Sequence, residues 1–175
     1  TELEIFDIEK LTTHGGSNRV FIKKKKSNKT INDNVIEIIN EELNMGMDKF
    51  ETYQKFAQNV INSKNETIKI FTELKKKNAK IIGYGATYKS STILNYCGLD
   101  TKFIDYFTDT TENKQGKFTP GTHIPIFKPT DEINIEINHI FLGAWNFKKE
   151  IFNKEKKFIE RGGKFISHVP YPQII

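Results

Sequence analysis

The stretch IIGYGATYKSSTILNYCGL, residues 81–99, decides the fold. Its first residues are apolar, as expected of a buried β-strand, and the apolar run breaks at two glycines. A helical periodicity follows over about 87–97, and Gly98 has the position of a glycine that ends a helix. A strand that turns through glycines into a helix is the first half of a parallel β–α–β unit. The stretch therefore predicts an α/β domain.

The residues that follow continue the alternation of strands and helices. Apolar runs predict strands at 102–109, 138–144 and 164–169, a short extended segment at 123–127, and a helix at about 147–160 with Asn146 as its N-cap. Strands that alternate with helices form parallel sheets that are covered on both faces. We therefore predict an α/β fold, with a small Rossmann-like parallel sheet of roughly four strands flanked by helices.

The first 77 residues have different patterns. Apolar and polar residues alternate over 2–9 and 18–24, on either side of the turn signal THGGS, which predicts a β-hairpin. Two amphipathic helical patterns follow; the second begins after Asp48, a candidate cap, and continues to about Lys77. The expected organisation is a β-hairpin at 1–26, a helical connector at 27–77 and a Rossmann-like domain at 78–175.

Composition narrows the class of protein. The 175 residues are 37% apolar and 12% aromatic, which is enough for a core, and neither a membrane-spanning run nor a signal peptide is visible. The single Cys97 excludes a disulfide framework and a multi-cysteine zinc site, and favours the reducing cytoplasm. The net charge is +5, and the lysine runs at 23–26 and 75–77 are typical of solvated element ends rather than of a nucleic-acid interface. Because the chain starts without Met inside a strand pattern, we expect it to be a fragment of a longer protein.

The turn after the first parallel strand has the chemistry of an anion site. A strand that enters a helix through glycines directs backbone amides at the space above the strand, and the N-terminus of the helix adds about half a positive charge. Gly85 would let a phosphate approach the backbone. A tight turn with a solvated lysine is the plainer alternative. The candidate phosphate-binding residues are Gly83, Tyr84, Gly85, Ala86, Lys89 and Ser90.

A dinucleotide is an alternative ligand for this turn. Its fingerprint requires a third small residue for close packing of the helix on the strand, and this chain has Tyr88 there. The fingerprint also requires an acid at the end of the next strand, for which Asp105 and Asp109 are candidates. An NAD(P)-binding domain of an oxidoreductase therefore stays open as an alternative. A non-catalytic interaction module, with the long helices of 33–77 forming a homodimer or interdomain interface, is another.

Further candidates lie where predicted strands end, because the carboxyl ends of parallel strands line the ligand crevice. Asp109, Lys114 and His123 follow the second parallel strand. Trp145 and Asn146 follow the third, where the indole ring has the chemistry to stack on a base or a sugar. A rim aromatic and a helix N-cap are the structural alternatives for these two. No spacing of residues points to a catalytic set or to a metal site in this chain.

Four longer motifs carry a family resemblance. They are GYGATYKSSTILNYCGL (83–99), KQGKFTPGTHIPI (114–126), AWNFKKEI (144–151) and GGKFISHVP (162–170). In this order and spacing they resemble the C-terminal domain of S-adenosylmethionine-dependent sugar-nucleotide C-methyltransferases, which make branched deoxysugars from keto-sugar nucleotides. The opening FDIEKLTTHGGSNRVFIKK is similar to the stretch that joins the methyltransferase domain of that family to its C-terminal domain. The resemblance covers nearly the whole chain.

The resemblance implies a three-part parent enzyme. Its N-terminal module would bind zinc, its central domain would bind S-adenosylmethionine, and this domain would bind the nucleotide-sugar. The family's Tyr-x-Glu-His motif, zinc cysteines and methyl-donor loop are absent here, so this chain alone is expected to bind neither cofactor and to methylate nothing. The hairpin is expected to be a remnant of the methyltransferase sheet. His14 and Arg19 match the family's His-Gly-Gly-Ser-x-Arg stretch, which places His14 near the substrate but not as the base.

One position departs from the family pattern, because Ser90 follows Lys89 where the family usually has Lys-Gly. The extra hydroxyl is expected either to narrow the phosphate pocket or to donate to the phosphate. In the resulting interpretation, residues 83–86 and Lys89 hold the diphosphate. The nucleotide or sugar end would be lined by Asp109, Lys114, His123, Trp145 and Asn146.

Overall fold

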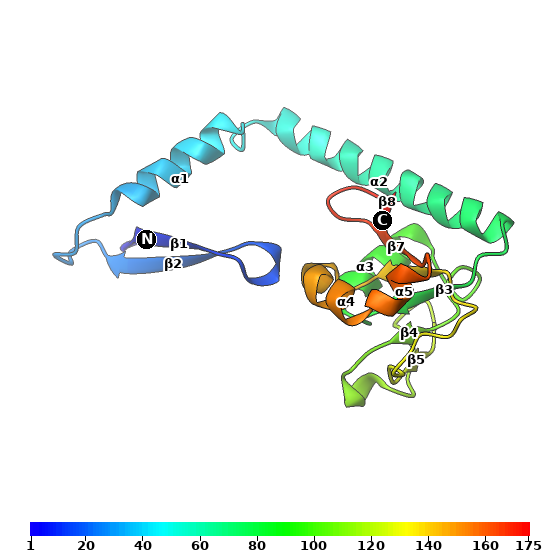
Figure 1. Ribbon diagram of the computed structural model, residues 1–175. Helices are drawn as coiled ribbons and strands as arrows, with labels where there is room; N and C mark the ends of the chain where they lie inside the picture. The colour runs from blue at the N-terminus through cyan, green and yellow to red at the C-terminus, as the bar shows by residue number, and fades with distance from the viewer. The chain divides into compact units, whose positions relative to one another are not determined.

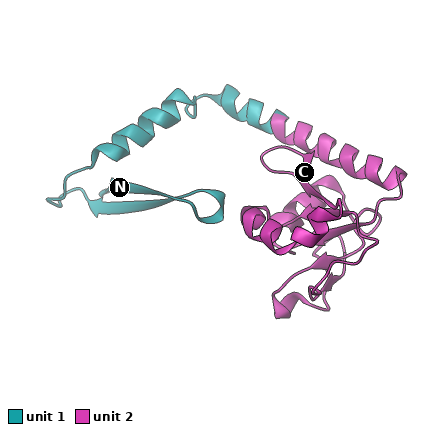
Figure 2. Ribbon diagram, in the orientation of Figure 1, with its two compact units in different colours: residues 1–58 teal, residues 59–175 magenta.

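The computed structural model describes all residues 1–175 (Figure 1). The chain forms two compact units, Thr1–Gln58 and Asn59–Ile175, coloured separately in Figure 2. The division falls inside helix α2, Phe50–Lys76, so the two ends of this helix belong to different units. It also falls inside the predicted connector 27–77, and the three-part organisation drawn from the sequence stays a prediction.

The first unit contains the predicted hairpin. Strands β1, Leu3–Leu11, and β2, Ser17–Lys24, pair antiparallel in a sheet of their own. Helix α1, Asp33–Asn44, contacts β1, and the Asn34 side-chain amide donates to Asp7 Oδ1 at 2.6 Å and to the Ile8 carbonyl at 2.8 Å. The alternating pattern of the sequence therefore identified the hairpin correctly.

This unit buries very little apolar surface. Val35 is the one apolar side chain of Thr1–Gln58 that is buried. Large apolar side chains elsewhere in the unit are exposed, among them Ile22 at 57%, Phe50 at 71% and Phe56 at 66%. Because apolar burial is the main stabilising contribution to folding, the hairpin and α1 do not form a core of ordinary size between them.

The second unit is built on a six-stranded sheet. Its strands are β3 (Ile81–Tyr84), β4 (Phe107–Thr108), β5 (Ile126–Phe127), β6 (His139–Leu142), β7 (Lys164–Ser167) and β8 (Gln173–Ile174). Their order is β5-β4-β3-β6-β7-β8, and every neighbouring pair is parallel except β7 and β8. The α/β prediction is thus confirmed. The expected number of roughly four parallel strands is one too low, and β8 was not predicted.

Helices cover both faces of this sheet. Successive residues of a strand point to opposite faces, and Ile81 belongs to one apolar cluster while Ile82 belongs to the other. The first cluster includes Phe71 of α2 and Leu94 of α3, Tyr88–Cys97. The second includes residues of two short helices, α4 (Lys148–Lys154) and α5 (Lys156–Glu160). None of the helices of the chain has the length and apolar character needed to cross a lipid bilayer.

The strand predicted at 102–109 is wrong in its first half. Asp100 accepts backbone hydrogen bonds from Phe103 at 3.0 Å and Ile104 at 3.1 Å, and its Oδ1 accepts one from the Lys102 amide at 2.9 Å. An aspartate that bonds the backbone two residues on stabilises a turn. The chain therefore turns after Asp100, and only Phe107–Thr108 is assigned to a strand.

The helix predicted at 147–160 is also different in the structure. It is divided at Glu155, whose φ of −98° and ψ of 31° are not helical. A 3₁₀ turn, Trp145–Phe147, precedes it, and Asn146 lies inside this turn. The N-cap of α4 is Phe147, so the prediction that Asn146 caps the helix is wrong. Likewise α2 begins at Phe50, which leaves Asp48 one residue before the N-cap position.

A buried histidine follows strand β7. His168 is only 9% exposed, its ring centroid lies 5.6 Å from that of Phe141, and its Nδ1 is buried without a hydrogen-bond partner. Burial in these surroundings disfavours the charged imidazolium and lowers the pKa of His168 to about 4. As the pH falls, His168 therefore binds a proton near pH 6.5 in the unfolded chain but only near pH 4 in the folded chain.

The free energy of unfolding is therefore expected to fall as the pH falls from about 6.5 towards 4. The loss attributable to His168 is about 2 kcal/mol at pH 5. Urea denaturation of the wild type and of His168→Phe at pH 7 and pH 5 measures it, because the variant has no proton to bind and should show a smaller pH-dependent loss. An equal loss in both proteins would contradict this account of His168.

Candidate functional site

The chain changes direction across the sheet between β3 and β6. From β3 it proceeds to β4 and β5 on one side, and it then crosses to β6 and β7 on the other. Ligands of open α/β sheets bind at the carboxyl ends of the strands near such a switch point. The loops that follow β3 and β6, residues 85–87 and 143–145, are therefore the first place to look for a site.

Hydrogen bonds join these two loops. The Tyr84 carbonyl accepts hydrogen bonds from the amides of Gly143 at 2.9 Å and Ala144 at 3.1 Å, and Thr87 Oγ1 donates to the Gly143 carbonyl at 3.1 Å. A Cβ atom on Gly85 would lie 2.5 Å from the Ala144 Cβ, and its φ of +81° is in the left-handed region. Close packing of the two loops thus requires glycine at this position, whatever the loop binds.

The loop after β3 leads directly into the capped N-terminus of α3. Thr87 is the N-cap, and its side chain accepts from the Ser90 amide at 3.1 Å. The Ser90 hydroxyl accepts from the Thr87 amide at 2.9 Å and donates to the Thr87 carbonyl at 2.8 Å. Ser90 is fully buried, so its hydroxyl closes the loop internally rather than facing a ligand.

A cavity of about 430 Å³ opens beside this loop, at the carboxyl ends of β3 and β4; we name it the strand-end cavity. Six of the residues that line it are Tyr84, Thr87, Thr108, Asp109, Lys114 and Lys154. Gly85 and Ala144, from the two hydrogen-bonded loops, also line it. Four residues expected to bind ligand from the sequence, Tyr84, Gly85, Asp109 and Lys114, are therefore brought together here.

Asp109 and Lys114 form an ion pair in the wall of this cavity. Lys114 Nζ lies 3.0 Å from Asp109 Oδ2, and Asp109 Oδ1 accepts from the Thr111 amide at 2.8 Å. Burial raises the pKa of Asp109, but the hydrogen bonds from Thr111 and the charge of Lys114 outweigh it, so the pKa lies below its usual value. The carboxylate is thus ionised at neutral pH and is an acceptor for donors such as hydroxyl groups.

Thr108 contributes a hydroxyl that has no partner. The residue is 9% exposed and lines the strand-end cavity, and its Oγ1 is buried without a hydrogen bond. A buried polar group without a partner costs about 1–3 kcal/mol, and such groups are rare in folded proteins. Thr108 lines the cavity, but its hydroxyl oxygen is covered by the protein and does not face the cavity.

A second cavity of about 190 Å³ lies on the other side of the α3 N-terminus; we name it the loop cavity. It is lined by Ala86 and Tyr88 from the start of α3, and by Phe118 and Pro120 from the segment between β4 and β5. Thr87 and Lys114 line both cavities, so the two meet at the start of the helix.

The other predicted site residues lie outside both cavities. Lys89 Nζ is 4.7 Å from the centroid of the Trp145 ring, a cation–π contact, and Trp145 also packs against the second apolar cluster. Asn146 is half-buried in its 3₁₀ turn, and His123 is exposed with a φ of +53°. His14 belongs to the hairpin turn of the first unit, also with positive φ.

The sequence reasoning missed Thr87, Thr108, Thr111 and Lys154. Thr87 carries a recognisable signal, because a threonine before a helical pattern is a common N-cap. Thr108 directly precedes Asp109 at the end of a strand, where the same crevice rule applies. For Lys154 the sequence has no signal, since it cannot say which face of α4 is turned towards the sheet edge.

Comparison with known proteins relates the chain to C-methyltransferases. Residues 12–170 match the family described as the C-methyltransferase C-terminal domain. The chain is also 34% identical over 173 residues to a protein named C-methyltransferase NovU, from Streptomyces niveus. That alignment covers 99% of the chain and 41% of the relative, so the chain spans less than half the length of this relative.

Proposed function

The chain belongs to the family of C-methyltransferase C-terminal domains, and from this membership we propose that it carries the substrate-binding domain of a methyltransferase that acts on a keto-deoxysugar nucleotide. The observation that best supports a bound substrate is the strand-end cavity beside the N-terminus of α3, which is lined by the Lys114 ammonium and the Asp109 carboxylate. A small molecule that carries both a phosphate and hydroxyl groups suits these two side chains.

The diphosphate is proposed to lie at the N-terminus of α3. The helix N-terminus favours negative charge there, and Lys114 adds a cation within reach of both cavities. Lys114 already neutralises Asp109, and its side chain is 36% exposed, so it is free to contact a phosphate as well. This placement keeps the diphosphate of the original interpretation but gives the lysine role to Lys114, because Lys89 lines neither cavity.

The sugar is proposed to occupy the strand-end cavity. Asp109 and Glu150 are the carboxylates that line it, and carboxylates accept hydrogen bonds from sugar hydroxyls. In this proposal the chain's residues hold and orient the substrate and exclude water from one side of it, while the methylation chemistry takes place on groups outside the chain.

The cofactors of the reaction are proposed to be bound by other parts of the enzyme. Zinc does not fit the residues present, because no group of three His, Cys, Asp or Glu side chains is placed to hold a metal ion, and the single Cys97 is buried. S-adenosylmethionine would supply the methyl group from the remainder of the parent enzyme. Such an enzyme, acting on a soluble nucleotide-sugar, would work in the cytoplasm.

The remainder of the enzyme is also the proposed partner of the first unit. The hairpin and α1 bury only Val35 and leave apolar side chains such as Ile22 and Ile36 exposed. Exposed apolar surface of this extent is typical of a protein interface. A further folded part of the same enzyme, rather than nucleic acid or a membrane, is the partner that we propose for this surface.

A fluorescence titration separates this function from a nicotinamide-binding one. Trp145 is the only tryptophan of the chain and lies in the loop next to Ala144, which lines the strand-end cavity. After correction for light absorbed by the ligand, its emission is expected to change saturably with a nucleoside diphosphate-sugar and to show no saturable change with NADH. Saturable binding of NADH without binding of any nucleoside diphosphate-sugar would contradict the proposed function.

A further inference from the structure

The loop cavity has the properties of a preformed site. Its outer wall is the segment 116–122, which is held by backbone hydrogen bonds from Gly116 to the Ile126 carbonyl and from Ile126 to the Lys117 carbonyl, each 2.9 Å long. Asn95 of α3 donates to the Pro120 carbonyl at 2.9 Å, which ties this wall to the helix on the opposite side of the cavity. A site that is ordered before the ligand arrives loses less entropy on binding.

Two aromatic side chains at the cavity are exposed to solvent. Tyr88 is 94% exposed and Phe118 is 62% exposed, although both line the cavity. Packing within the chain therefore does not explain why an aromatic residue stands at either position. Aromatic rings that stand open beside a cavity are the usual platform on which nucleic-acid bases stack, and such stacking tolerates any base.

The polar groups of the two cavities differ in a way that suits different parts of one ligand. The strand-end cavity contains the carboxylates Asp109 and Glu150, which suit hydroxyl donors. The loop cavity contains no carboxylate; its polar side chains include the amide of Asn113 and the ammonium of Lys117. An amide both donates and accepts, as recognition of a base edge requires.

We propose that the loop cavity binds the nucleobase of the substrate, stacked against Tyr88 and Phe118, while the diphosphate crosses the start of α3. The proposal rests on the proposed function, since it assumes that the strand-end cavity takes the sugar of the same molecule. The two cavities share Thr87 and Lys114, so one extended ligand can pass from one to the other over the helix N-terminus. The loop cavity would then select the nucleotide, and the strand-end cavity would select the sugar.

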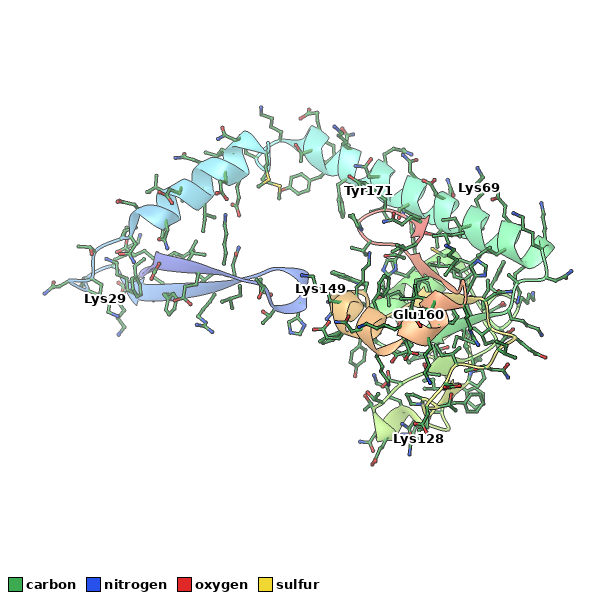
Figure 3. All side chains as sticks on the ribbon, viewed as in Figure 1. Lys29, Lys69, Lys128, Lys149, Glu160 and Tyr171 are labelled. Atoms are coloured by element: carbon green, nitrogen blue, oxygen red, sulfur yellow. The ribbon has the colours of Figure 1, made fainter.

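Calorimetry of the chain tests this with two ligands. The first is the tightest binder among the diphosphates of thymidine, uridine, guanosine and adenosine; the second is inorganic pyrophosphate, which lacks a base. We expect Tyr88→Ala and Phe118→Ala each to weaken nucleoside diphosphate binding about tenfold and to leave pyrophosphate binding within about twofold. Tyr171→Ala is the matched control, because Tyr171 is 75% exposed and lines neither cavity (Figure 3).

The outcomes separate the two proposals. If the nucleoside diphosphate and pyrophosphate bind equally tightly, or if the Tyr88 and Phe118 variants bind the nucleoside diphosphate as well as the Tyr171 variant does, the base subsite is wrong and the substrate-binding function stands. If the wild-type chain binds neither ligand, the substrate-binding function itself is wrong, and the base subsite is wrong with it.

Discussion

Replacing Gly85 by alanine is expected to lower the free energy of unfolding of the second unit by about 3 kcal/mol. The left-handed φ of +81° costs an alanine about 1 kcal/mol or more. The added Cβ would also lie 2.5 Å from the Ala144 Cβ and 3.2 Å from the Ala144 nitrogen, where the loop after β6 is held by hydrogen bonds to Tyr84. The two loops must then move apart.

Gly98→Ala is the matched control for this prediction. Gly98 also has a left-handed φ, +67°, but a Cβ on it would meet nothing within 4 Å. This variant should therefore lose only the backbone contribution, about 1 kcal/mol. Urea denaturation followed by Trp145 fluorescence measures both. Equal losses in the two variants would show that packing against Ala144 is not what requires glycine at position 85.

Gly85 is therefore a poor position at which to test ligand binding. A variant of Gly85 that failed to bind a nucleotide would not distinguish a lost phosphate contact from a displaced loop. The sequence alone favoured Gly85 as a place of phosphate approach, because glycine after a strand is the signature of such loops. Side chains that line the cavities and are partly exposed are the better targets.

Lys114→Gln is expected to weaken binding of a nucleoside diphosphate by about 10- to 100-fold. Lys114 lines both cavities at the start of α3, and a charge-assisted hydrogen bond to phosphate contributes about 1.5–3 kcal/mol. The variant should also raise the pKa of Asp109, because it removes the cation 3.0 Å from that carboxylate. Both effects follow from the position of one ammonium group.

Lys128→Gln provides the control, since it makes the same change in charge at a lysine that lines neither cavity (Figure 3). Calorimetric titration of both variants with the same nucleoside diphosphate gives the comparison. If the two variants bind the nucleoside diphosphate equally well, the Lys114 ammonium contributes no more to binding than a lysine outside the cavities. That result would contradict the placement of the diphosphate at the start of α3.

Much of the fold could be predicted because its elements have clear periodicities. The hairpin alternates apolar and polar residues, and the apolar strand that begins at Ile81 is followed by glycines and a helical pattern. The errors occur where a local side-chain hydrogen bond or a very short element determines the backbone structure. Asp100 forms a turn that shortens the strand before Phe107, and Gln173–Ile174 is too short for any pattern to identify.

The candidate site could be predicted only in part. The rule that ligands bind at strand ends identified Asp109 and Lys114, which the structure brings together as an ion pair. The rule could not show that Ser90 is fully buried in the capping of α3, or that Trp145 packs against Lys89, because both depend on tertiary packing. Nor could it find Lys154, which reaches the cavity from a helix distant in the sequence.

Calorimetric titration of the chain with nucleoside diphosphate-sugars tests the central claim most directly. We predict saturable binding of one molecule per chain, an affinity that falls as salt is added because the contacts are ionic, and a further loss in Lys114→Gln. Absence of heat with every thymidine, uridine, guanosine and adenosine diphosphate-sugar would contradict the account, provided that circular dichroism shows the chain folded and the parent enzyme binds its own substrate.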